Sequence, residues 1–433
     1  MSKVVGVLLA WSLLASSLVL AGEFQLERKK IPLTPKNAEI LPEIELRPQI
    51  LPETVTEPRY RSRTAQKFFA RFGGSAGETE SGDGGIGVAF AVDEREGTGE
   101  GFDCLIVDTA GSGQLTSGRR LVGKALPRGW SFVDTSFPPF DIAIPGPDST
   151  LDYPIAARFS IERNATGNST LYLTPLCYLE GKVELGGKKQ TLLVFDANCN
   201  GIFGERLTGT RAPVGGVGFA GAPSGAAPGA APSGDKIWIG TGTPRGDAAY
   251  TEALPLGRYF LFEDAYYEIT IDEKDLASVV KADVPLGTVK VGNPGFVLEL
   301  VSRDGVLYAS NEKGQEIIVP VGSYQLKTAS FRQRFRGSIW ELEGEPGACN
   351  KSVTITEGTT TAVDVGPPLR IVVTTTMTPQ GTGTVAYHDF RIEGGYGEKY
   401  KYLRKDGRKV DLPEIFVRSP GNKVVKKGQF EYG

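Results

Sequence analysis

The sequence predicts an all-β protein built from tandem β-sandwich domains. From about residue 65 onward, short apolar or alternating runs are separated by Gly, Pro, Asn and Asp. These runs are rich in β-branched and aromatic residues, which favours strands, and beyond a weak signal at Ala65–Phe72 no stretch keeps helical periodicity. Short strands with frequent turn residues are typical of sandwiches. The clearest expected strands are Ile86–Val92, Cys104–Val107, Leu171–Leu173, Leu192–Phe195, Ile237–Ile239, Tyr266–Ile271, Phe296–Val301, Ile317–Val319, Ile371–Thr376, Val385–Ile392 and Ile415–Val417.

Residues 1–21 predict a signal peptide. Residues 4–21 are almost entirely apolar, and Val19 and Ala21 fit the small-residue rule for cleavage before Gly22. A retained membrane anchor is the alternative, because the run is nearly long enough to span a bilayer. No later segment is apolar enough to cross a membrane. We therefore expect a secreted, periplasmic or cell-envelope protein with no membrane span after signal removal.

Residues 22–64 are expected to form a Pro-rich extended spacer. Prolines at positions 32, 35, 42, 48, 52 and 58 stand among charged and aliphatic residues. Such spacing interrupts helices and sheet ladders and favours the polyproline II conformation. The alternative is that this segment lies over the surface of the first domain.

Three β-rich units are expected after the spacer. The first covers residues 65–285 and contains a Gly/Ala/Pro-rich insertion at 208–234, whose composition buries too little apolar surface to become ordered. A β-sandwich module is predicted for 286–368 and a small C-terminal sandwich for 369–433. The boundary at Gly366–Pro368 is placed where two prolines interrupt any strand. We expect these sandwiches to be immunoglobulin-like.

One segment carries recognisable chemistry. It reads D-A-N-C-N-G-I-F-G from Asp196 and follows an apolar strand. Oxygen-bearing side chains recur at every second position, at Asp196, Asn198 and Asn200, and Gly201 supplies a sharp turn. This is the first half of a calcium loop of the D-x-[DN]-x-[DN]-G type, in which the backbone carbonyl of the seventh residue, Ile202, is a further ligand. The sequence therefore predicts a Ca²⁺ site.

The expected calcium site is weak and structural. A complete EF-hand loop ends in a bidentate Glu at its twelfth position, which is Leu207 in this chain. Glu205 and Asp235, which opens the strand after the insertion, are the acidic residues expected to complete the site. With one or two carboxylates, the dissociation constant is expected to be on the order of 10⁻⁴–10⁻³ M. The alternative is an Asx-stabilised β-turn that binds no metal.

A degenerate copy of the loop lies upstream. Residues 105–115 align with 193–203, because both have a strand, an Asp, a Gly five residues later and an apolar residue two further on. In the upstream copy Ala110 replaces the third-position ligand, and Ser112 is a weak fifth-position ligand. We therefore expect the same turn there without the charge that holds a metal.

The loop and its flanks resemble segments of known secreted proteins. The strand followed by D-x-N-x-N-G-x-F resembles the calcium loops of secreted bacterial all-β proteins and, more remotely, dockerin-like and EF-hand-like loops. L-E-G-K-V-E-L-G-G-K, G-P-P-L and K-G-Q-F-E-Y-G are similar to segments of uncharacterised secreted bacterial β-sandwich proteins. Residues 286–368, with I-I-V-P-V-G-S-Y-Q-L, resemble transthyretin-like and carboxypeptidase-regulatory-like modules. These resemblances imply calcium binding at the loop and a structural or adhesive module, but no helix–loop–helix fold.

Little in the sequence points to catalysis. The single histidine, His388, lies in an alternating strand, and the chain has no Walker-type phosphate loop. Glu263, Asp264 and Glu268 stand in an aromatic stretch that could face a sugar, although alternation of core and solvated residues explains the stretch equally well. The cysteines match no zinc spacing, and both disulfides and buried free thiols remain open for Cys104, Cys177, Cys199 and Cys349.

These features together predict a non-enzymatic structural or binding protein of the cell envelope or exterior, stabilised by a weak Ca²⁺ site. Its partner is expected to be extracellular, either a protein or a polysaccharide. A net charge of −3 with both signs interspersed gives no indication of nucleic-acid binding. The alternative is a carbohydrate-binding or carboxylate-dependent polysaccharide-active protein. No catalytic residue is predicted.

Overall fold

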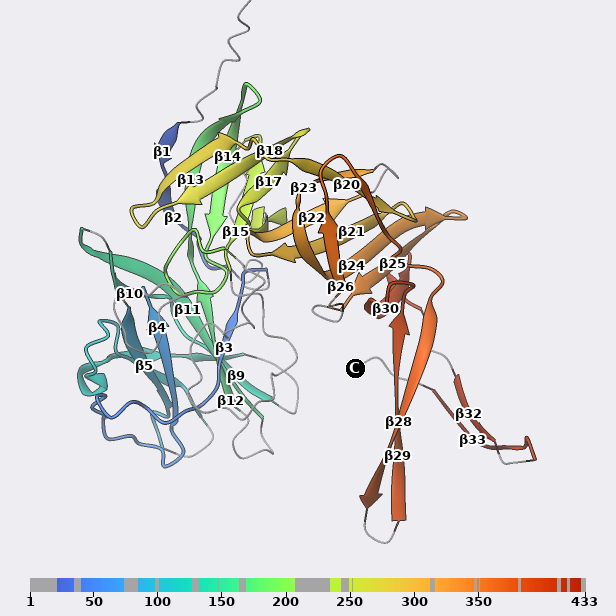
Figure 1. The fold of residues 1–433 in the computed structure, drawn as a ribbon. Coiled ribbons are helices and arrows are strands. Elements are labelled where there is room, and N and C mark those ends of the chain that lie inside the picture. The colour runs from blue at the N-terminus through green and yellow to red at the C-terminus, as the bar shows by residue number, and fades with distance from the viewer. Residues whose placement is uncertain are drawn as a thin grey trace, which may run out of the picture.

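The structure is a computed structural model (Figure 1). It consists mainly of β-strands, which confirms the predicted all-β fold. The predicted signal peptide and all but the last residue of the predicted 208–234 insertion lie outside the described residues. Within the described part, no helix is both long and apolar enough to cross a bilayer. The structure describes residues 22–34, 40–73, 85–97, 101–126, 132–146, 148–162, 169–206, 234–242, 249–250, 252–311, 316–345, 349, 351–380, 383–410, 414–418 and 421–429.

The chain up to Lys281 supplies four sheets. The first has the order β4 (Gln66–Phe72), β5 (Ile86–Asp93), β6 (Cys104–Val107) and β7 (Arg119–Val122), with a 3-10 turn, η2 (Leu115–Ser117), before β7. The second has the order β3 (Ile44–Leu46), β12 (Ser169–Pro175), β11 (Thr150–Glu162), β9 (Phe132–Ser136) and β8 (Lys124–Leu126), and β10 (Phe140–Pro145) also pairs with β11. The third has the order β16 (Leu254–Pro255), β15 (Lys236–Gly240), β14 (Lys188–Phe195), β13 (Cys177–Leu185) and β2 (Glu27–Lys30). The fourth has the order β1 (Glu23–Gln25), β19 (Leu276–Lys281), β18 (Ala265–Ile271) and β17 (Tyr259–Phe262).

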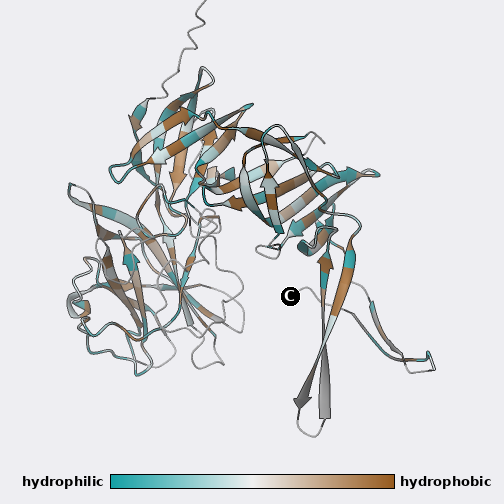
Figure 2. Ribbon diagram, viewed as in Figure 1, coloured by the Kyte–Doolittle hydropathy of each residue, from teal (hydrophilic) through white to brown (hydrophobic). Residues whose placement is uncertain are grey.

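One hydrophobic core joins these four sheets. Phe68 of β4 and Phe159 of β11 meet edge to face with ring centroids 6.2 Å apart, and Leu192 and Val194 of β14 belong to the same buried cluster. Apolar residues alternate with polar ones along many strands (Figure 2), which is the pattern of a sheet with one face on a core. All four cysteines are buried and free.

Strand β14 is covered on both faces, and this decides where the predicted calcium loop lies. Leu192 and Val194 point into the large core, whereas Leu193 and Phe195 belong to a second cluster with Tyr250. Side chains of a strand alternate between its two faces, so the strand is buried continuously from Gln190 to Phe195. Asp196, the next residue, therefore enters the interior instead of solvent.

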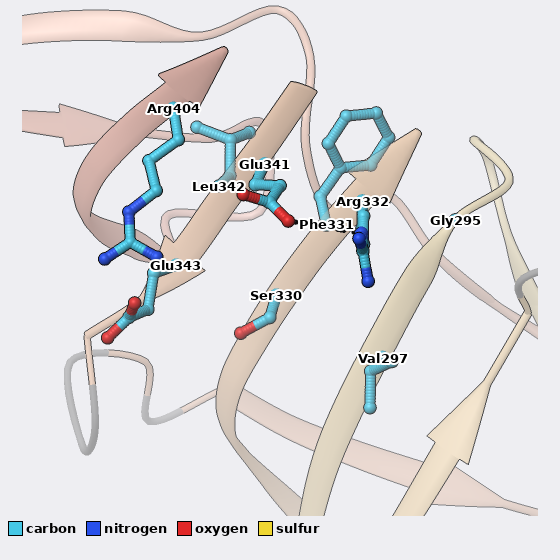
Figure 3. A pocket seen from close by; sticks show the side chains of 9 residues that line it. All are labelled: Gly295, Val297, Ser330, Phe331, Arg332, Glu341, Leu342, Glu343 and Arg404. Atoms are coloured by element: carbon cyan, nitrogen blue, oxygen red, sulfur yellow. Dashed lines mark ion pairs between the residues drawn. The ribbon is translucent and has the colours of Figure 1, made fainter. Parts of the chain in front are cut away.

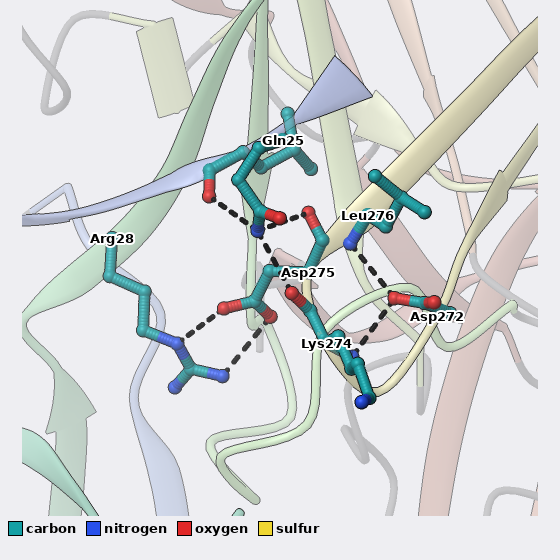
Figure 4. Close-up of polar contacts among 7 residues, drawn as sticks. Gln25, Arg28, Asp272, Lys274, Asp275 and Leu276 are labelled. Carbon is teal, nitrogen blue, oxygen red and sulfur yellow. Dashed lines mark hydrogen bonds and ion pairs between the residues drawn. The ribbon is translucent and has the colours of Figure 1, made fainter. Parts of the chain in front are cut away.

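The segment predicted as a spacer, 22–64, is part of the fold. β1 pairs with β19, β2 pairs with β13, and β3 pairs with β12, so the prolines only separate short strands. Arg28 donates two hydrogen bonds to the Asp275 carboxylate, 2.7 and 3.1 Å long, and Gln25 Nε2 donates to backbone carbonyls at Lys274 and Asp275 (Figure 4). The segment thus supplies an edge strand to three sheets of the first domain, which differs from the extended spacer expected.

After Lys281 the chain builds two further sheets and a separate hairpin. In the three-stranded sheet, β20 (Leu286–Val291) lies between the antiparallel β23 (Ile317–Pro320) and the parallel β27 (Thr360–Val363). The nine-stranded sheet has the order β22 (Gly305–Ser310), β21 (Phe296–Ser302), β24 (Gly322–Phe335), β25 (Ser338–Gly344), β30 (Lys399–Lys405), β29 (Gly383–Glu393) and β28 (Arg370–Gln380), with β26 (Lys351–Ile355) on β24 and β31 (Arg408–Lys409) on β30. β32 (Glu414–Arg418) and β33 (Val424–Gln429) pair only with each other among the described strands.

Residues beyond 369 therefore do not form the separate small sandwich that was expected. β30 pairs with β25 over Trp340–Gly344, and β29 continues the same sheet. Ile392 and Tyr400 belong to the same buried cluster as Phe296 and Leu326. The chain turns at Gly366–Pro368 from β27 of the three-stranded sheet to β28 of the nine-stranded sheet. Val363 before the turn and Ile392 after it belong to the same buried cluster, so this turn is not a boundary between cores.

Candidate functional site

The Asp196 loop leaves the buried end of β14 and runs to Arg206, the last residue described before the insertion. Cys199 and Gly201 have left-handed backbone conformations, at φ 55° and 85°, and Gly204 also has a positive φ, 93°. A Cβ at Gly201 would lie 2.7 Å from Ile144 Cδ1, so packing and conformation both require glycine. Cys199 and Gly201 reverse the direction of the chain within the core, where Asp196 is 1% exposed.

The Asp196 carboxylate organises the turn. Its Oδ2 accepts hydrogen bonds from the Gly201 N–H at 2.7 Å and from the Tyr153 hydroxyl at 2.6 Å, and Oδ1 accepts one from the Asn200 N–H at 3.3 Å. This is the Asx-turn pattern in which an aspartate replaces backbone partners. Burial nevertheless raises the pKa of Asp196 to about 6, because the hydrogen bonds only partly offset desolvation and the Glu205 charge.

Glu205 reaches back into the loop, as the sequence suggested it could. Its Oε2 accepts hydrogen bonds from Asn198 Nδ2 at 2.7 Å and from Asn200 Nδ2 at 2.6 Å. The amide oxygens face the backbone instead, since Asn200 Oδ1 accepts from the Ile202 N–H at 2.9 Å. The two amides thus supply the positive partial charge that surrounds Glu205, and this is the role that a cation would take over.

Asp235 completes the cluster from the far side of the insertion. Its Oδ2 accepts hydrogen bonds from the N–H groups of Gly204 at 2.7 Å and Glu205 at 3.0 Å. Its Oδ1 is buried with no hydrogen-bond partner, and the residue is fully buried. Burial, followed by the charges of Asp196 and Glu205, raises the pKa of Asp235 well above its ordinary value. A carboxylate oxygen without a donor in the interior is costly, so this oxygen is the point at which a ligand would gain most.

The six predicted ligand residues therefore gather at one place. Asp196, Asn198, Asn200, Ile202 and Glu205 share the loop, and Asp235 contacts it through two backbone N–H groups. Within the described part of the chain, no three His, Cys, Asp or Glu side chains converge as a ready-made metal site. Any cation here would depend on amide and backbone oxygens besides the carboxylates, which suits Ca²⁺ better than Zn²⁺.

The degenerate copy at Asp108 has the same turn with fewer acids. Asp108 Oδ2 accepts from the Gly113 N–H at 2.7 Å, the same length and the same five-residue spacing as Asp196 and Gly201. Ser112 Oγ donates to Asp108 Oδ1 at 3.0 Å, occupying the second oxygen. The two copies therefore share the hydrogen bond from the Gly N–H to the Asp carboxylate, which forms the turn. They differ in the additional acidic residues, which only the Asp196 loop has.

Tyr153 and Arg28 are the neighbours that sequence reasoning missed. Tyr153 comes from β11 and is fully buried against the loop, while the Arg28 guanidinium lies over the Phe203 ring at 5.1 Å from its centroid. Arg28 also bonds Asp275, so the loop contacts the N-terminal segment through Phe203. Neither residue has a local sequence signal: Arg28 is brought near the loop by the pairing of β2 with β13, and Tyr153 lies on β11 of a different sheet.

The acidic aromatic stretch gives no paired-carboxylate site. Glu263 forms an ion pair with Lys188 at 2.5 Å, and Glu268 forms one with Arg258 at 2.7 Å. The aromatic rings pack in the hydrophobic core: Tyr267 is buried and stacks on Phe260 with ring centroids 5.7 Å apart. The backbone of His388 lies in β29 opposite Thr375.

A shallow groove of about 220 Å³ lies on the nine-stranded sheet (Figure 3). Charged side chains from β24, β25 and β30 line it, and Arg332 pairs with Glu341 at 3.1 Å. Glu343, Arg404 and the Ser330 hydroxyl lie beside this pair in the close-up.

Comparisons with protein-family models, curated proteins and solved structures gave no significant match.

Proposed function

We propose that the chain is a non-enzymatic structural or binding protein of the cell envelope or exterior, whose first domain is stabilised by weakly bound Ca²⁺ at the Asp196 loop. The observation that carries the proposal is Asp235 Oδ1, a buried carboxylate oxygen without a donor beside two more acids. A divalent cation offsets the repulsion among Asp196, Glu205 and Asp235, which the fold otherwise confines in a low-dielectric interior.

The proposed ligands are the side-chain oxygens of Asp196, Asn198, Asn200, Glu205 and Asp235 and the Ile202 carbonyl. Binding requires the Asn198 and Asn200 amides to present oxygen instead of nitrogen, which a rotation about the terminal torsion achieves. The cation supplies charge compensation and cross-links the two chain segments that flank the insertion. Its role is therefore structural.

Calorimetric titration with Ca²⁺, paired with thermal unfolding, tests the proposal. The wild type should bind one Ca²⁺ on the order of 10⁻⁴–10⁻³ M, and its free energy of unfolding should rise by about 1.4 kcal/mol at ten times the dissociation constant. Asp196→Ala should abolish the heat of binding. Asp108→Ala is the matched control, because it removes the equivalent Asp–Gly turn bond at the copy with fewer acids. No heat and no change in melting temperature up to ~10 mM Ca²⁺ would leave only the metal-free turn.

The groove on the nine-stranded sheet supports carbohydrate binding as the second candidate function. Guanidinium and carboxylate groups at Arg332, Glu341, Glu343 and Arg404 can bond the hydroxyl groups of a saccharide. A glycan array tests this candidate, followed by isothermal titration of any hit with Arg404→Ala. Saturable binding that this substitution weakens would support it, and an empty array would leave the structural role alone.

A further inference from the structure

Asn200 and Gly201 form the only Asn-Gly pair in the sequence. An asparagine loses its side-chain amide when the backbone nitrogen of the next residue attacks the amide carbon, and glycine, which has no Cβ, obstructs this attack least. The pair lies in the Asp196 loop, where Asn200 is only half-buried and so remains open to water. The contacts of the reacting groups therefore decide whether the fold promotes this reaction.

The attacking group is the Gly201 nitrogen, and its N–H donates to Asp196 Oδ2 at 2.7 Å. A carboxylate oxygen at hydrogen-bond distance from the proton that must be removed is the arrangement of a general base. The upstream copy has the same bond between Gly113 and Asp108, but Ser112 precedes that glycine and offers no amide. The two copies thus share the base, and only the Asp196 loop places an amide beside it.

The side chain of Asn200 is folded toward the Gly201 nitrogen. Its Oδ1 accepts a hydrogen bond from the Ile202 N–H at 2.9 Å, which closes an Asx turn. The ring closed by this bond contains Cγ, Cβ, Cα and C of Asn200 and the Gly201 nitrogen, and these are the atoms of a succinimide ring. The Ile202 N–H also stabilises the negative charge that develops on Oδ1 during the attack, as a donor of an oxyanion hole does.

The leaving nitrogen is held by a carboxylate. Asn200 Nδ2 donates to Glu205 Oε2 at 2.6 Å, and the same oxygen accepts from Asn198 Nδ2 at 2.7 Å. The bond to Glu205 keeps the amide nitrogen on one side and Oδ1 toward the Ile202 N–H. Asn198 differs from Asn200 because Cys199 follows it, and a side chain on the following residue hinders attack by the backbone nitrogen.

We propose that Asn200 converts itself to aspartate in the folded, calcium-free protein. The Gly201 nitrogen forms a bond to Asn200 Cγ and passes its proton to Asp196. The Cγ–Nδ2 bond then breaks, and the leaving nitrogen takes up that proton and departs as ammonia. Water opens the succinimide: its oxygen bonds to Cγ, and the Gly201 nitrogen recovers a proton. One amide and one water thus give one carboxylic acid and one ammonia.

The product changes the charge of the proposed calcium site. Conversion replaces the Nδ2 donor of Asn200 by a carboxylate oxygen, so two carboxylates face each other where a hydrogen bond to Glu205 existed. Together with Asp196, Glu205 and Asp235 the site then has four acids, and the affinity of calcium loops depends on the number of charged ligands. This consequence rests on the proposed calcium function, whereas the conversion itself does not.

Peptide mapping by mass spectrometry tests the conversion in the full chain. The wild type is incubated in chelator, and the tryptic peptide 190–206, which contains both Asn198 and Asn200, is followed over time. Asn200 should gain the mass difference between NH₂ and OH while Asn198 stays unchanged. The conversion should be at least ~10-fold faster in the folded protein than in the same chain in denaturant. Equal rates in the two states, or no conversion, would overturn the proposal.

A pair of substitutions tests the base. Asp196→Asn keeps an oxygen for the Gly201 N–H but removes the carboxylate, and it should slow the conversion at least ~10-fold. Asp108→Asn, the same change in the upstream copy, should leave the rate unchanged. Circular dichroism establishes that each variant is folded. A folded Asp196→Asn protein that converts at the wild-type rate would contradict the proposal, and if this variant does not fold, the comparison of folded and denatured wild type decides.

A calorimetric Ca²⁺ titration separates the conversion from the calcium function. Asn200→Asp should bind Ca²⁺ at least ~10-fold more tightly than the unconverted wild type, and equal affinities would overturn the consequence for the site. If Asn200 converts and neither protein binds Ca²⁺, the conversion is supported and the calcium function is overturned. If the wild type binds Ca²⁺ and Asn200 remains asparagine, the conversion alone is overturned.

Discussion

Glu205 and Asp235 are joined by two hydrogen bonds although thirty positions separate them. The Glu205 N–H donates to Asp235 Oδ2 at 3.0 Å, and the Asp235 N–H donates to the Glu205 carbonyl at 2.9 Å. The chain therefore holds together two acidic residues that would otherwise repel each other.

Replacing Asp235 by Asn should stabilise the calcium-free protein. Asn keeps an oxygen to accept from the Gly204 and Glu205 N–H groups and removes a buried charge that has no cation, so the free energy of unfolding at pH 7.5 should rise by about 1 kcal/mol. The response to Ca²⁺ should disappear in the same variant. Chemical denaturation with and without chelator measures both effects. A loss of stability in chelator would show that the charge of Asp235 is already compensated.

The calcium-free protein should become more stable as the pH falls toward 4. Asp196 has a folded pKa of about 6, above the 3.8 of an unperturbed aspartate, so the folded state binds the extra proton between these values. Its contribution to the free energy of unfolding is most unfavourable above pH 6, and the penalty is lost as the pH falls through the folded pKa. Asp196→Asn should flatten this part of the profile by on the order of 2 kcal/mol. Urea denaturation in chelator at several pH values makes the measurement, and parallel profiles would contradict the assignment.

Removing the Tyr153 hydroxyl should destabilise the loop. Tyr153→Phe deletes the 2.6 Å hydrogen bond to Asp196 Oδ2 in a fully buried setting, which is expected to cost about 1.5–3 kcal/mol when Asp196 is ionised. Because that hydrogen bond lowers the pKa of Asp196, the variant should also shift the pH dependence of stability to higher pH. Tyr178→Phe is a control on a half-exposed hydroxyl, whose contact with Glu180 is 3.5 Å long.

Gly201→Ala should be far more damaging than the same change at Gly187. Both glycines have positive φ, 85° and 75°, but a Cβ at Gly201 meets Ile144 at 2.7 Å while one at Gly187 meets nothing within 4 Å. We expect about 1 kcal/mol at Gly187 from conformation alone and more than 2 kcal/mol at Gly201. Thermal unfolding of the two variants provides the comparison, and equal losses would mean that the core yields around Ile144.

The sequence was sufficient for the fold class and for the residues of the loop, because both have local patterns. Alternation marked the strands, and the spacing of Asp196, Asn198 and Asn200 marked the turn. The partners of the loop could not be read in this way, since Tyr153 lies 43 positions before Asp196 and on a strand of a different sheet. The pairing of β1–β3 with later strands was also missed. These strands have only three or four residues, and the prolines between them indicated an extended segment outside any sheet.

The C-terminal region shows the same limit. Its strands were expected from composition, but whether they close on themselves or extend an existing sheet depends on β25 meeting β30. The sequence near Gly366 indicates a turn and says nothing of where the chain returns. Edge and centre positions in a sheet are properties of the assembled fold.

The attachment of the N-terminal segment sets a limit on when the first domain can finish folding. Glu23 pairs with Ser278, and Gln25 Nε2 bonds the carbonyl of Asp275, 250 positions away. The strand that pairs with β1, β19, is therefore the last strand of that domain to be synthesised. Contacts so distant in sequence slow folding and prolong the time in which unpaired strand edges are exposed. The domain should acquire its native core only after residue 281 is available, and its first residues should be among the last to become protected from hydrogen exchange.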